Sequence, residues 1–197
     1  MRDRVRYDER TALVVVDLQN DFAQPEGSLY VRGGEEIVGA ANLEVERALA
    51  AGAFVVYTQD WHPPDTPHFA PYGGKWPVHC VHDTWGAEFP PGLVVVGPQV
   101  RKARGHEDGY SGFTVEHVRT GARFSTDLET LLCAREITKL VIVGLATDYC
   151  VKETGLDGIR LGFHVTVLRD AVRAVDVEPG DGERALDELA AAGVMVV

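Results

Sequence analysis

The segment that decides the fold reads Thr138-Lys-Leu-Val-Ile-Val-Gly-Leu-Ala-Thr-Asp-Tyr-Cys150. Its first half is a continuous apolar run, typical of a strand buried on both faces, and the Gly-Leu-Ala turn leads into a helical pattern over 149–161. Cys150 therefore lies at the start of a helix, where unpaired N–H groups and the helix dipole favour a thiolate. A buried structural cysteine is the alternative, because free cysteines are often buried. The choice depends on which side chains the rest of the chain brings to Cys150.

Strand and helix patterns alternate along the rest of the chain. Further apolar runs predict strands at residues 11–17, 53–59, 93–97, 164–168 and 193–197. Helical patterns lie between several of them, at residues 35–51, 126–135 and 182–192. Alternation of buried strands with helices predicts an α/β fold, a three-layer sandwich in which a parallel sheet of about six strands carries helices on both faces. With 197 residues, the chain is expected to form one domain over 1–197.

Composition narrows the classes of partner and the compartment. A formal net charge of -11 provides no attraction to phosphate, which argues against nucleic acids and anionic membranes as partners. No run approaches the roughly 18 apolar residues of a membrane span, and the charged N-terminus lacks the apolar core of a signal peptide. The 3 cysteines are an odd number, which argues against a disulfide framework and predicts the reducing cytoplasm. The sequence leaves the oligomeric state open, including a homo-oligomer.

Two long segments, 60–92 and 98–124, interrupt the alternation of strands and helices. Both are rich in glycine, proline, histidine and aromatic residues. Loops of this length in a compact domain are usually functional or disordered, and the aromatic content disfavours disorder. We therefore expect the two segments to take part in a functional site.

Chemically active side chains follow the predicted strands. Asp17 ends the first apolar run, Asp60 follows the second, Lys102 follows the third, and Cys150 follows the fourth. Because ligands of open parallel sheets bind beyond the carboxyl ends of the strands, we expect these side chains at one edge. A carboxylate there can take a thiol proton, and an ammonium can stabilise the resulting negative charge. The alternatives are a solvated surface lysine at Lys102 and a partly buried structural carboxylate at Asp17.

Four of the 7 histidines are concentrated in the first of the two long segments, at His62, His68, His79 and His82. Together with Asp60 they offer the carboxylate and imidazole ligands that suit zinc, manganese or iron. The spacing supports His82 least. Surface histidines in a polar loop are the alternative interpretation.

With these residues assembled, the chain resembles the isochorismatase-like hydrolase superfamily over essentially its whole length, and within it is similar to the nicotinamidases. The resemblance rests on short motifs that occur in the family's order: Val15-Val-Asp17-Leu-Gln-Asn-Asp21-Phe22, Thr58-Gln-Asp60-Trp-His62 with Pro67-His68-Phe69, Trp76-Pro-Val-His79-Cys80, Lys102 with Tyr110-Ser-Gly-Phe113, and Gly144-Leu-Ala-Thr-Asp-Tyr-Cys150-Val. It implies one bound divalent transition metal ion (zinc, iron or manganese), which also holds the pyridine nitrogen of the substrate. The residues facing that ion would be Asp60, His62, His68 and His79.

The resemblance also implies an activity on a small-molecule substrate, the hydrolysis of nicotinamide, and of pyrazinamide, to the acid and ammonia through a thioester. Asp17, Lys102 and Cys150 would form the catalytic triad. The backbone N–H groups of Ala146 and Cys150 would hold the oxyanion, after a cis peptide bond between Leu145 and Ala146. The ring of the substrate would lie between three aromatic side chains, Phe22, Trp76 and Tyr110.

Two other functions fit the same residues. One is a related amidohydrolase that acts on another small amide or carbamoyl compound with the same triad. The other is a catalytically silent metal- or ligand-binding module, although such a module needs no complete triad. The stretch 103–109 is more charged than the resemblance leads us to expect, which can alter access to the pocket or the choice of substrate. We assign no metal-binding role to His106 within it.

Overall fold

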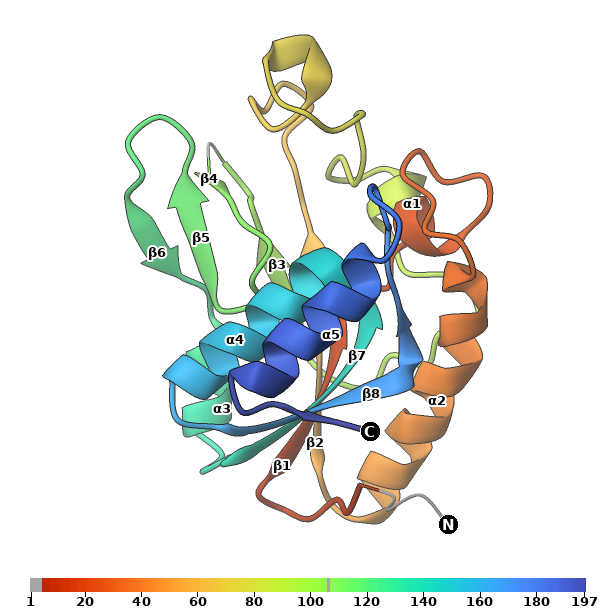
Figure 1. The fold of residues 1–197 in the computed structure, drawn as a ribbon, viewed down its shortest axis with the longest axis vertical. Coiled ribbons are helices and arrows are strands. Elements are labelled where there is room, and N and C mark those ends of the chain that lie inside the picture. Colours follow the sequence, from red (N-terminus) through yellow and green to blue (C-terminus); the bar gives the residue numbers. More distant parts are fainter. Residues whose placement is uncertain (1–4, 106) are drawn as a thin grey trace.

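In the computed structural model, which describes residues 5–105 and 107–197, six strands form a parallel central sheet in the order β3-β2-β1-β7-β8-β9 (Figure 1). Each neighbouring pair of these strands is parallel. The strands are β1 (Thr11–Val16), β2 (Phe54–Asp60), β3 (Gln99–Lys102), β7 (Lys139–Leu145), β8 (His164–Arg173) and β9 (Met195–Val196). The carboxyl ends of these strands therefore meet at one edge of the sheet, as parallel pairing requires.

Helices cover both faces of the sheet (Figure 1). They are α2 (Gly34–Ala50) on one face and α3 (Leu128–Cys133), α4 (Lys152–Arg160) and α5 (Asp181–Ala191) on the other. Strand β1 explains the arrangement, because Leu13 and Val15 belong to the core shared with α2, whereas Val14 and Val16 belong to the core shared with α3 and α5. The predicted three-layer α/β fold is confirmed.

Residues 93–97 do not form a strand, so that prediction is wrong, and β3 begins two residues later. Pro98 follows the run directly and has no N–H to donate to a sheet ladder. Gly97 crosses β2 so closely that a Cβ atom there would lie 1.9 Å from the carbonyl oxygen of Val55. The side chain of Asn42 on α2 accepts from Val94 N–H and donates to a neighbouring carbonyl, both at 2.8 Å. The three valines of the run are consequently 38% to 49% exposed.

The two long segments have structure of their own. Residues 61–92 contain two short 3-10 helices, η1 (Ala70–Tyr72) and η2 (Trp85–Ala87), and the part of this segment around η1 lies beyond the carboxyl end of β2 (Figure 1). The second segment contains a small antiparallel sheet that the sequence did not predict, made of β4 (Glu107–Asp108), β5 (Thr114–His117) and β6 (Arg123–Ser125). His106, for which we assigned no metal role, lies outside the described residues.

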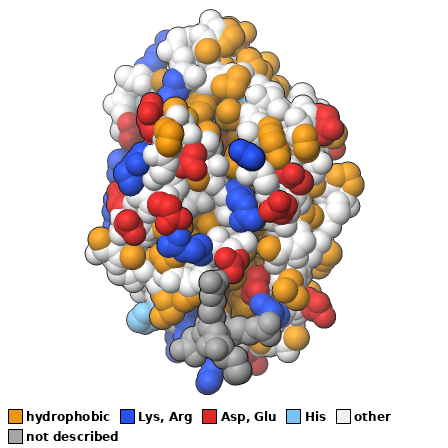
Figure 2. All heavy atoms as spheres, turned by 45° about the vertical axis from the view of Figure 1, so that its right-hand side comes forward, with side chains coloured by type: hydrophobic (Ala, Val, Ile, Leu, Met, Phe, Trp, Pro, Cys, Tyr) orange, Lys and Arg blue, Asp and Glu red, His pale blue; other side chains and the backbone are white. Residues whose placement is uncertain are grey.

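Two further observations concern the distribution of side chains on the surface and the length of the helices. On the face in Figure 2, acidic and basic side chains are mixed over the middle of the molecule, and hydrophobic side chains gather toward the top, at the end where Figure 1 places η1. Among the helices of residues 5–105 and 107–197, none combines the length and the hydropathy that a membrane span requires.

Candidate active site

The strand ends bring together three residues that we call the triad: Asp17, Lys102 and Cys150. Asp17 follows β1 directly, Lys102 is the last residue of β3, and Cys150 lies in a π-helical turn, η3 (Thr147–Val151), between β7 and α4. Their exposed fractions are 0%, 1% and 5%. The ammonium of Lys102 lies 2.9 Å from Asp17 Oδ2 and 3.6 Å from Cys150 Sγ. The solvated-lysine alternative is therefore excluded.

The position of the Asp17 carboxylate is fixed by its backbone and by one hydroxyl. Asp17 has a φ of 44°, in the left-handed region that aspartate tolerates better than most residues. Thr58 Oγ donates to Asp17 Oδ1 at 2.6 Å and accepts from the Asp17 N–H at 3.2 Å. The carboxylates of Asp17 and Asp60 and the thiol of Cys150 each place one atom within 4.8 Å of the others. Uncommon backbone geometry of this kind concentrates at functional sites.

The surroundings of the triad shift the pKa values of its three side chains. Burial raises the pKa of the Cys150 thiol well above its usual value, and Asp17 raises it further, although Lys102 acts in the opposite direction. Burial opposes the charge of Lys102, but the carboxylates of Asp17 and Asp60 raise the pKa of this ammonium well above its usual range. Burial also raises the pKa of Asp17 despite the neighbouring Lys102. Burial therefore opposes the thiolate that the start of a helix was expected to favour.

Three buried imidazoles lie beside the triad, and we call them the imidazole cluster: His62, His68 and His79. One possible ligand atom from each lies within 4.8 Å of the others. The ring of Phe69 packs edge-on against all three, with centroid distances of 5.3 to 5.9 Å. His82 is outside the cluster and pairs with Asp83 at the surface.

Asp60 connects the imidazole cluster to the triad. Its Oδ2 lies 3.7 Å from His62 Nε2 and 4.0 Å from His79 Nε2, while its Oδ1 accepts a hydrogen bond from Lys102. Burial opposes the charge of Asp60, but Lys102 and the imidazoles hold the pKa of this carboxyl well below its usual value. One ionised carboxylate therefore faces both groups.

The donor set of the imidazole cluster fits a divalent transition metal. Both ring nitrogens of His62 are buried and have no hydrogen-bond partner among the residues that the structure describes, a costly arrangement that a bound cation would relieve. The Nδ1 atoms of His68 and His79 are already engaged, by Asp108 Oδ2 at 2.5 Å and Pro77 O at 2.8 Å, which leaves Nε2 of each for a ligand bond. Burial lowers the pKa of His79 to about 4, so its ring is neutral, as metal binding requires.

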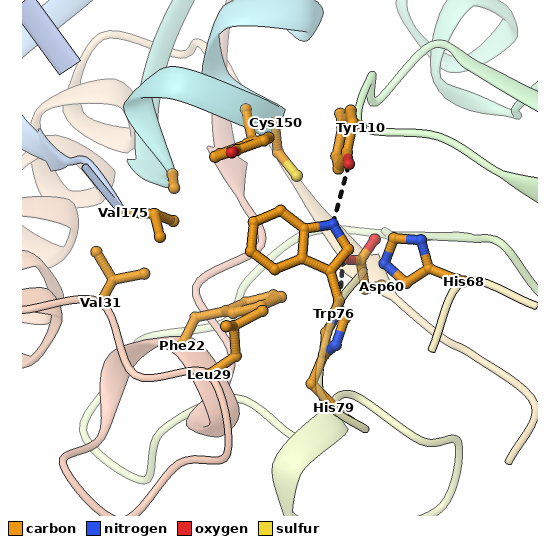
Figure 3. A pocket seen from close by; sticks show the side chains of 12 residues that line it. Phe22, Leu29, Val31, Asp60, His68, Trp76, His79, Tyr110, Cys150 and Val175 are labelled. Atoms are coloured by element: carbon orange, nitrogen blue, oxygen red, sulfur yellow. Dashed lines mark hydrogen bonds and ion pairs between the residues drawn. The ribbon is translucent and has the colours of Figure 1, made fainter. Parts of the chain in front are cut away.

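A cavity of about 370 Å³ lies between the triad and the imidazole cluster (Figure 3). Its wall is mostly apolar and aromatic, and Asp60, His68 and His79 supply the polar groups, a combination typical of small-molecule sites. The predicted pocket residues Phe22, Trp76 and Tyr110 line it, as do Ala146 and Cys150. Trp76 Nε1 donates to Tyr110 Oη at 3.0 Å, which fixes the two rings relative to each other.

Several residues of the cavity wall were missed by sequence reasoning. They are Leu29, Val31, Tyr149 and Val175. The aliphatic ones come from loops and carry no pattern that distinguishes them from core residues. Tyr149 had a signal, because it directly precedes the cysteine. The peptide bond before Ala146 is cis, as the resemblance implied.

Comparisons with known proteins agree with this geometry. The family model described as an isochorismatase domain matches residues 11–197. The nicotinamidase of Escherichia coli (strain K12) is 37% identical in an alignment of 200 positions, and this alignment covers 92% of this chain and 92% of the relative.

Two solved structures extend the comparison to the fold. A crystal structure of the pyrazinamidase of Pyrococcus horikoshii in complex with zinc has a TM-score of 0.84 and 39% sequence identity, covering 95% of this chain and 98% of that one. A structure of PnC1 from L. infantum in complex with nicotinate has a TM-score of 0.85 and 33% identity, covering 98% and 95%. The chain belongs to the isochorismatase family.

Proposed function

We propose that this protein is a metal-dependent cysteine amidohydrolase that converts nicotinamide to nicotinate and ammonia through a thioester on Cys150. The observation that carries the proposal is the meeting of a thiol, an acid and an ammonium with three imidazoles beside one cavity, which Cys150, His68 and His79 line. The E. coli relative is a nicotinamidase, and the L. infantum structure holds nicotinate, which supports this choice of substrate. The P. horikoshii pyrazinamidase supports pyrazinamide as a second substrate.

The first half of the reaction forms the thioester. Asp17 takes the proton of the Cys150 thiol as the sulfur attacks the carboxamide carbon, because burial raises the pKa of this thiol and so favours its protonated form before the attack. The ammonium of Lys102 stabilises the negative charge that develops, and the backbone N–H groups of Ala146 and Cys150 hold the oxyanion. Asp17 then gives its proton to the amide nitrogen, the C–N bond breaks, and ammonia leaves.

The second half releases the acid. Asp17, again a carboxylate, takes a proton from the water that attacks the thioester. The C–S bond breaks, nicotinate leaves, and Asp17 returns the proton to the sulfur of Cys150. Lys102 stays protonated throughout, since its pKa is well above the usual range.

The imidazole cluster and Asp60 would hold a zinc, iron or manganese ion. When bound, this ion would supply a Lewis-acid site for the lone pair of the pyridine nitrogen and so orient the ring. The rings of Phe22 and Trp76 would enclose the flat faces of the substrate. Zinc in the P. horikoshii pyrazinamidase supports a metal here.

Three further assignments complete the proposal. We place the protein in the cytoplasm, because Cys80, Cys133 and Cys150 are all free, as reducing compartments favour. Two assignments stay predictions. One is that residues 1–197 form a single domain, and the other is that the protein binds a small-molecule substrate and neither a nucleic acid nor a membrane. A single cooperative unfolding transition would support the single domain.

The test measures ammonia release from nicotinamide by the wild type, by Cys150→Ala and by metal-stripped protein. The wild type should be active, Cys150→Ala should lose at least about 10⁴-fold in turnover, and stripped protein should recover when metal is returned. Cys133→Ala is the matched control, because Cys133 is exposed and outside the site, and it should keep wild-type turnover. Full turnover in Cys150→Ala would refute the nucleophile.

The same assay separates the competing functions. A wild type that leaves nicotinamide intact but hydrolyses another small amide or carbamoyl compound would favour the related amidohydrolase. Metal binding without hydrolysis of any of these compounds would favour the silent module.

A further inference from the structure

A segment on the small antiparallel sheet contacts both parts of the site. Asp108, at the end of β4, places Oδ2 at 2.5 Å from Nδ1 of His68 in the imidazole cluster. The next residue, Gly109, uses its carbonyl oxygen to accept from Nζ of Lys102 in the triad at 3.2 Å. The last residue of β4 and the residue after it therefore contact the site at two points that the catalytic proposal does not use.

The orientation of the Asp108 carboxylate is set by its surroundings. Its Oδ1 accepts the N–H of Gly109 at 2.7 Å, which directs Oδ2 toward His68. Asp108 lies opposite Glu116 in the antiparallel pairing of β4 with β5. Gly109 passes so close to β5 that a Cβ atom would lie 2.8 Å from the carbonyl oxygen of Thr114. The hairpin thus holds the carboxylate in one place.

The contact selects one tautomer of His68. An ionised carboxylate only accepts hydrogen bonds, so the ring hydrogen of neutral His68 lies on Nδ1 and the lone pair lies on Nε2. His79 is oriented in the same sense by the carbonyl oxygen of Pro77. The His68 side chain is 5% exposed and that of Asp108 is 30% exposed, so water competes only from one side.

We propose that Asp108 is a positioning residue that holds His68 with its hydrogen on Nδ1 and aims Nε2 at the bound divalent metal. The inference rests on the metal site of the proposed function and adds a residue to it. Asp108 belongs to the charged stretch 103–109, and its charge acts on the imidazole of His68 rather than on the substrate. A carboxylate in this position makes the ligating nitrogen more basic as well as better oriented.

The first test is a Zn²⁺ titration of metal-free protein in competition with a chromophoric chelator. Asp108→Ala should bind Zn²⁺ about 10- to 100-fold more weakly than the wild type. Asp108→Asn should fall between them, because its amide oxygen accepts the hydrogen bond but carries no charge; it also serves as the folded variant if the alanine variant does not fold.

The matched control is Asp83→Ala. Asp83 accepts from His82 Nδ1 at 2.9 Å, so it forms the same kind of pair outside the imidazole cluster. Its substitution should leave the Zn²⁺ affinity unchanged.

The second test reads the tautomer directly by ¹H–¹⁵N NMR of the histidine rings in metal-free protein. Wild-type His68 should carry its hydrogen on Nδ1, and Asp108→Ala should shift it toward Nε2 while His79 keeps its tautomer. A purely structural role for Asp108 would lower the melting temperature without this selective change.

The outcomes separate this inference from the proposed function. Equal Zn²⁺ affinity in wild type and folded Asp108 variants, or an unchanged His68 tautomer, overturns the role of Asp108 alone. A wild type that binds no divalent metal overturns both this inference and the metal site.

Discussion

The triad and the imidazole cluster share one cavity but are held in place in different ways. The triad residues stand at strand ends or beside one, so the hydrogen-bonded sheet positions their backbones, and their opposite charges compensate one another when buried. The imidazoles come from residues 61–82, which contribute no strand to the central sheet. The first group is therefore built into the fold, whereas the second depends on hydrogen bonds from outside the central sheet and on the proposed metal.

Residues 60–82, which we call the histidine segment, are held in place by backbone hydrogen bonds. One of these bonds lies within the segment, and others come from α1 (Asn20–Ala23) and from Gln19, the residue before it. The N–H of His62 donates to Cys80 O at 3.0 Å, which brings the two ends of the segment together. Asp21 accepts the N–H of Cys80 at 2.7 Å, directly after His79. Gln19 both donates to the carbonyl and accepts from the N–H of Asp60, at 2.7 and 2.8 Å. Residues 17–21 thus support the triad and the imidazole cluster together.

Asp17→Asn should give the largest effect and break the triad alone. The amide cannot take the thiol proton, so we expect kcat to fall about 10³- to 10⁴-fold, or about 4 to 5.5 kcal/mol in the barrier. Because the carboxylate raises the pKa of Cys150, its removal should lower that pKa and speed alkylation of Cys150 at neutral pH. Iodoacetamide labelling against pH, in a Cys133→Ser background, measures this.

The control for this prediction is Asp157→Asn, a buried carboxylate on α4 that pairs with Arg160 and should leave kcat unchanged. A loss of alkylation together with turnover would contradict the role of Asp17, because the two are expected to move in opposite directions.

Lys102→Met should destabilise the fold at the point where the triad meets Asp60. Two buried carboxylates would lose their cation, so the free energy of unfolding at pH 8 should fall by about 3 to 5 kcal/mol. Without the ammonium, the folded-state pKa values of Asp17 and Asp60 should exceed those of the unfolded chain. The folded state then takes up protons as pH falls, and the loss should be smaller at pH 5.

Denaturant titrations at the two pH values measure this loss. Lys139→Met is the control, because Lys139 pairs with Asp8 at the surface, 2.6 Å apart, where water and salt screen the charges, so its loss should change stability little. A loss that is the same at pH 5 and pH 8 would show that buried charge is not its cause.

Asp21→Asn should give the smallest effect and act on the imidazole cluster. The carboxylate accepts the N–H groups of Ser28 and Cys80, and the amide can accept only one of them well, so we expect a loss of about 1 to 3 kcal/mol in unfolding free energy. The affinity for Zn²⁺ should fall, since Cys80 follows His79, while the alkylation profile of Cys150 should stay as in the wild type.

Asp148→Asn is a close control, because Asp148 is equally buried and also accepts two backbone N–H groups, those of Val175 and Asp176. It should cost similar stability and leave Zn²⁺ affinity unchanged. Equal losses of Zn²⁺ affinity in both variants would mean that general destabilisation, not the histidine segment, is responsible.

Much of the fold and the grouping of the triad could be predicted because buried parallel strands leave a simple pattern. Residues 11–17 and 139–144 are continuous apolar runs, and the residues after parallel strands must converge. Residues 93–97 show the same pattern but do not form a strand, because Pro98 has no N–H for the ladder and Gly97 passes close to β2. Apolar character alone does not distinguish a strand from an exposed run beside one.

The rest of the site depends on contacts that no local pattern carries. Asp108 and His68 are 40 residues apart, and their hydrogen bond is visible only after the chain has folded. The aliphatic wall residues Leu29, Val31 and Val175 come from separate loops. The raised pKa of Cys150 depends on the extent of burial, which the helix-dipole argument from sequence leaves out.

The departure of residues 93–97 from the sheet also bears on self-association at high concentration. β3 is an edge strand of only 4 residues, and its outer side is where a strand of another molecule would add. Had the valine run continued this strand, the edge would have been longer and apolar over residues 93–96, the kind of edge that favours aggregation. Pro98 and the hydrogen bonds from Asn42 keep the run out of the ladder. The proline is therefore a barrier against intermolecular β-sheet growth, independent of its distance from the catalytic chemistry.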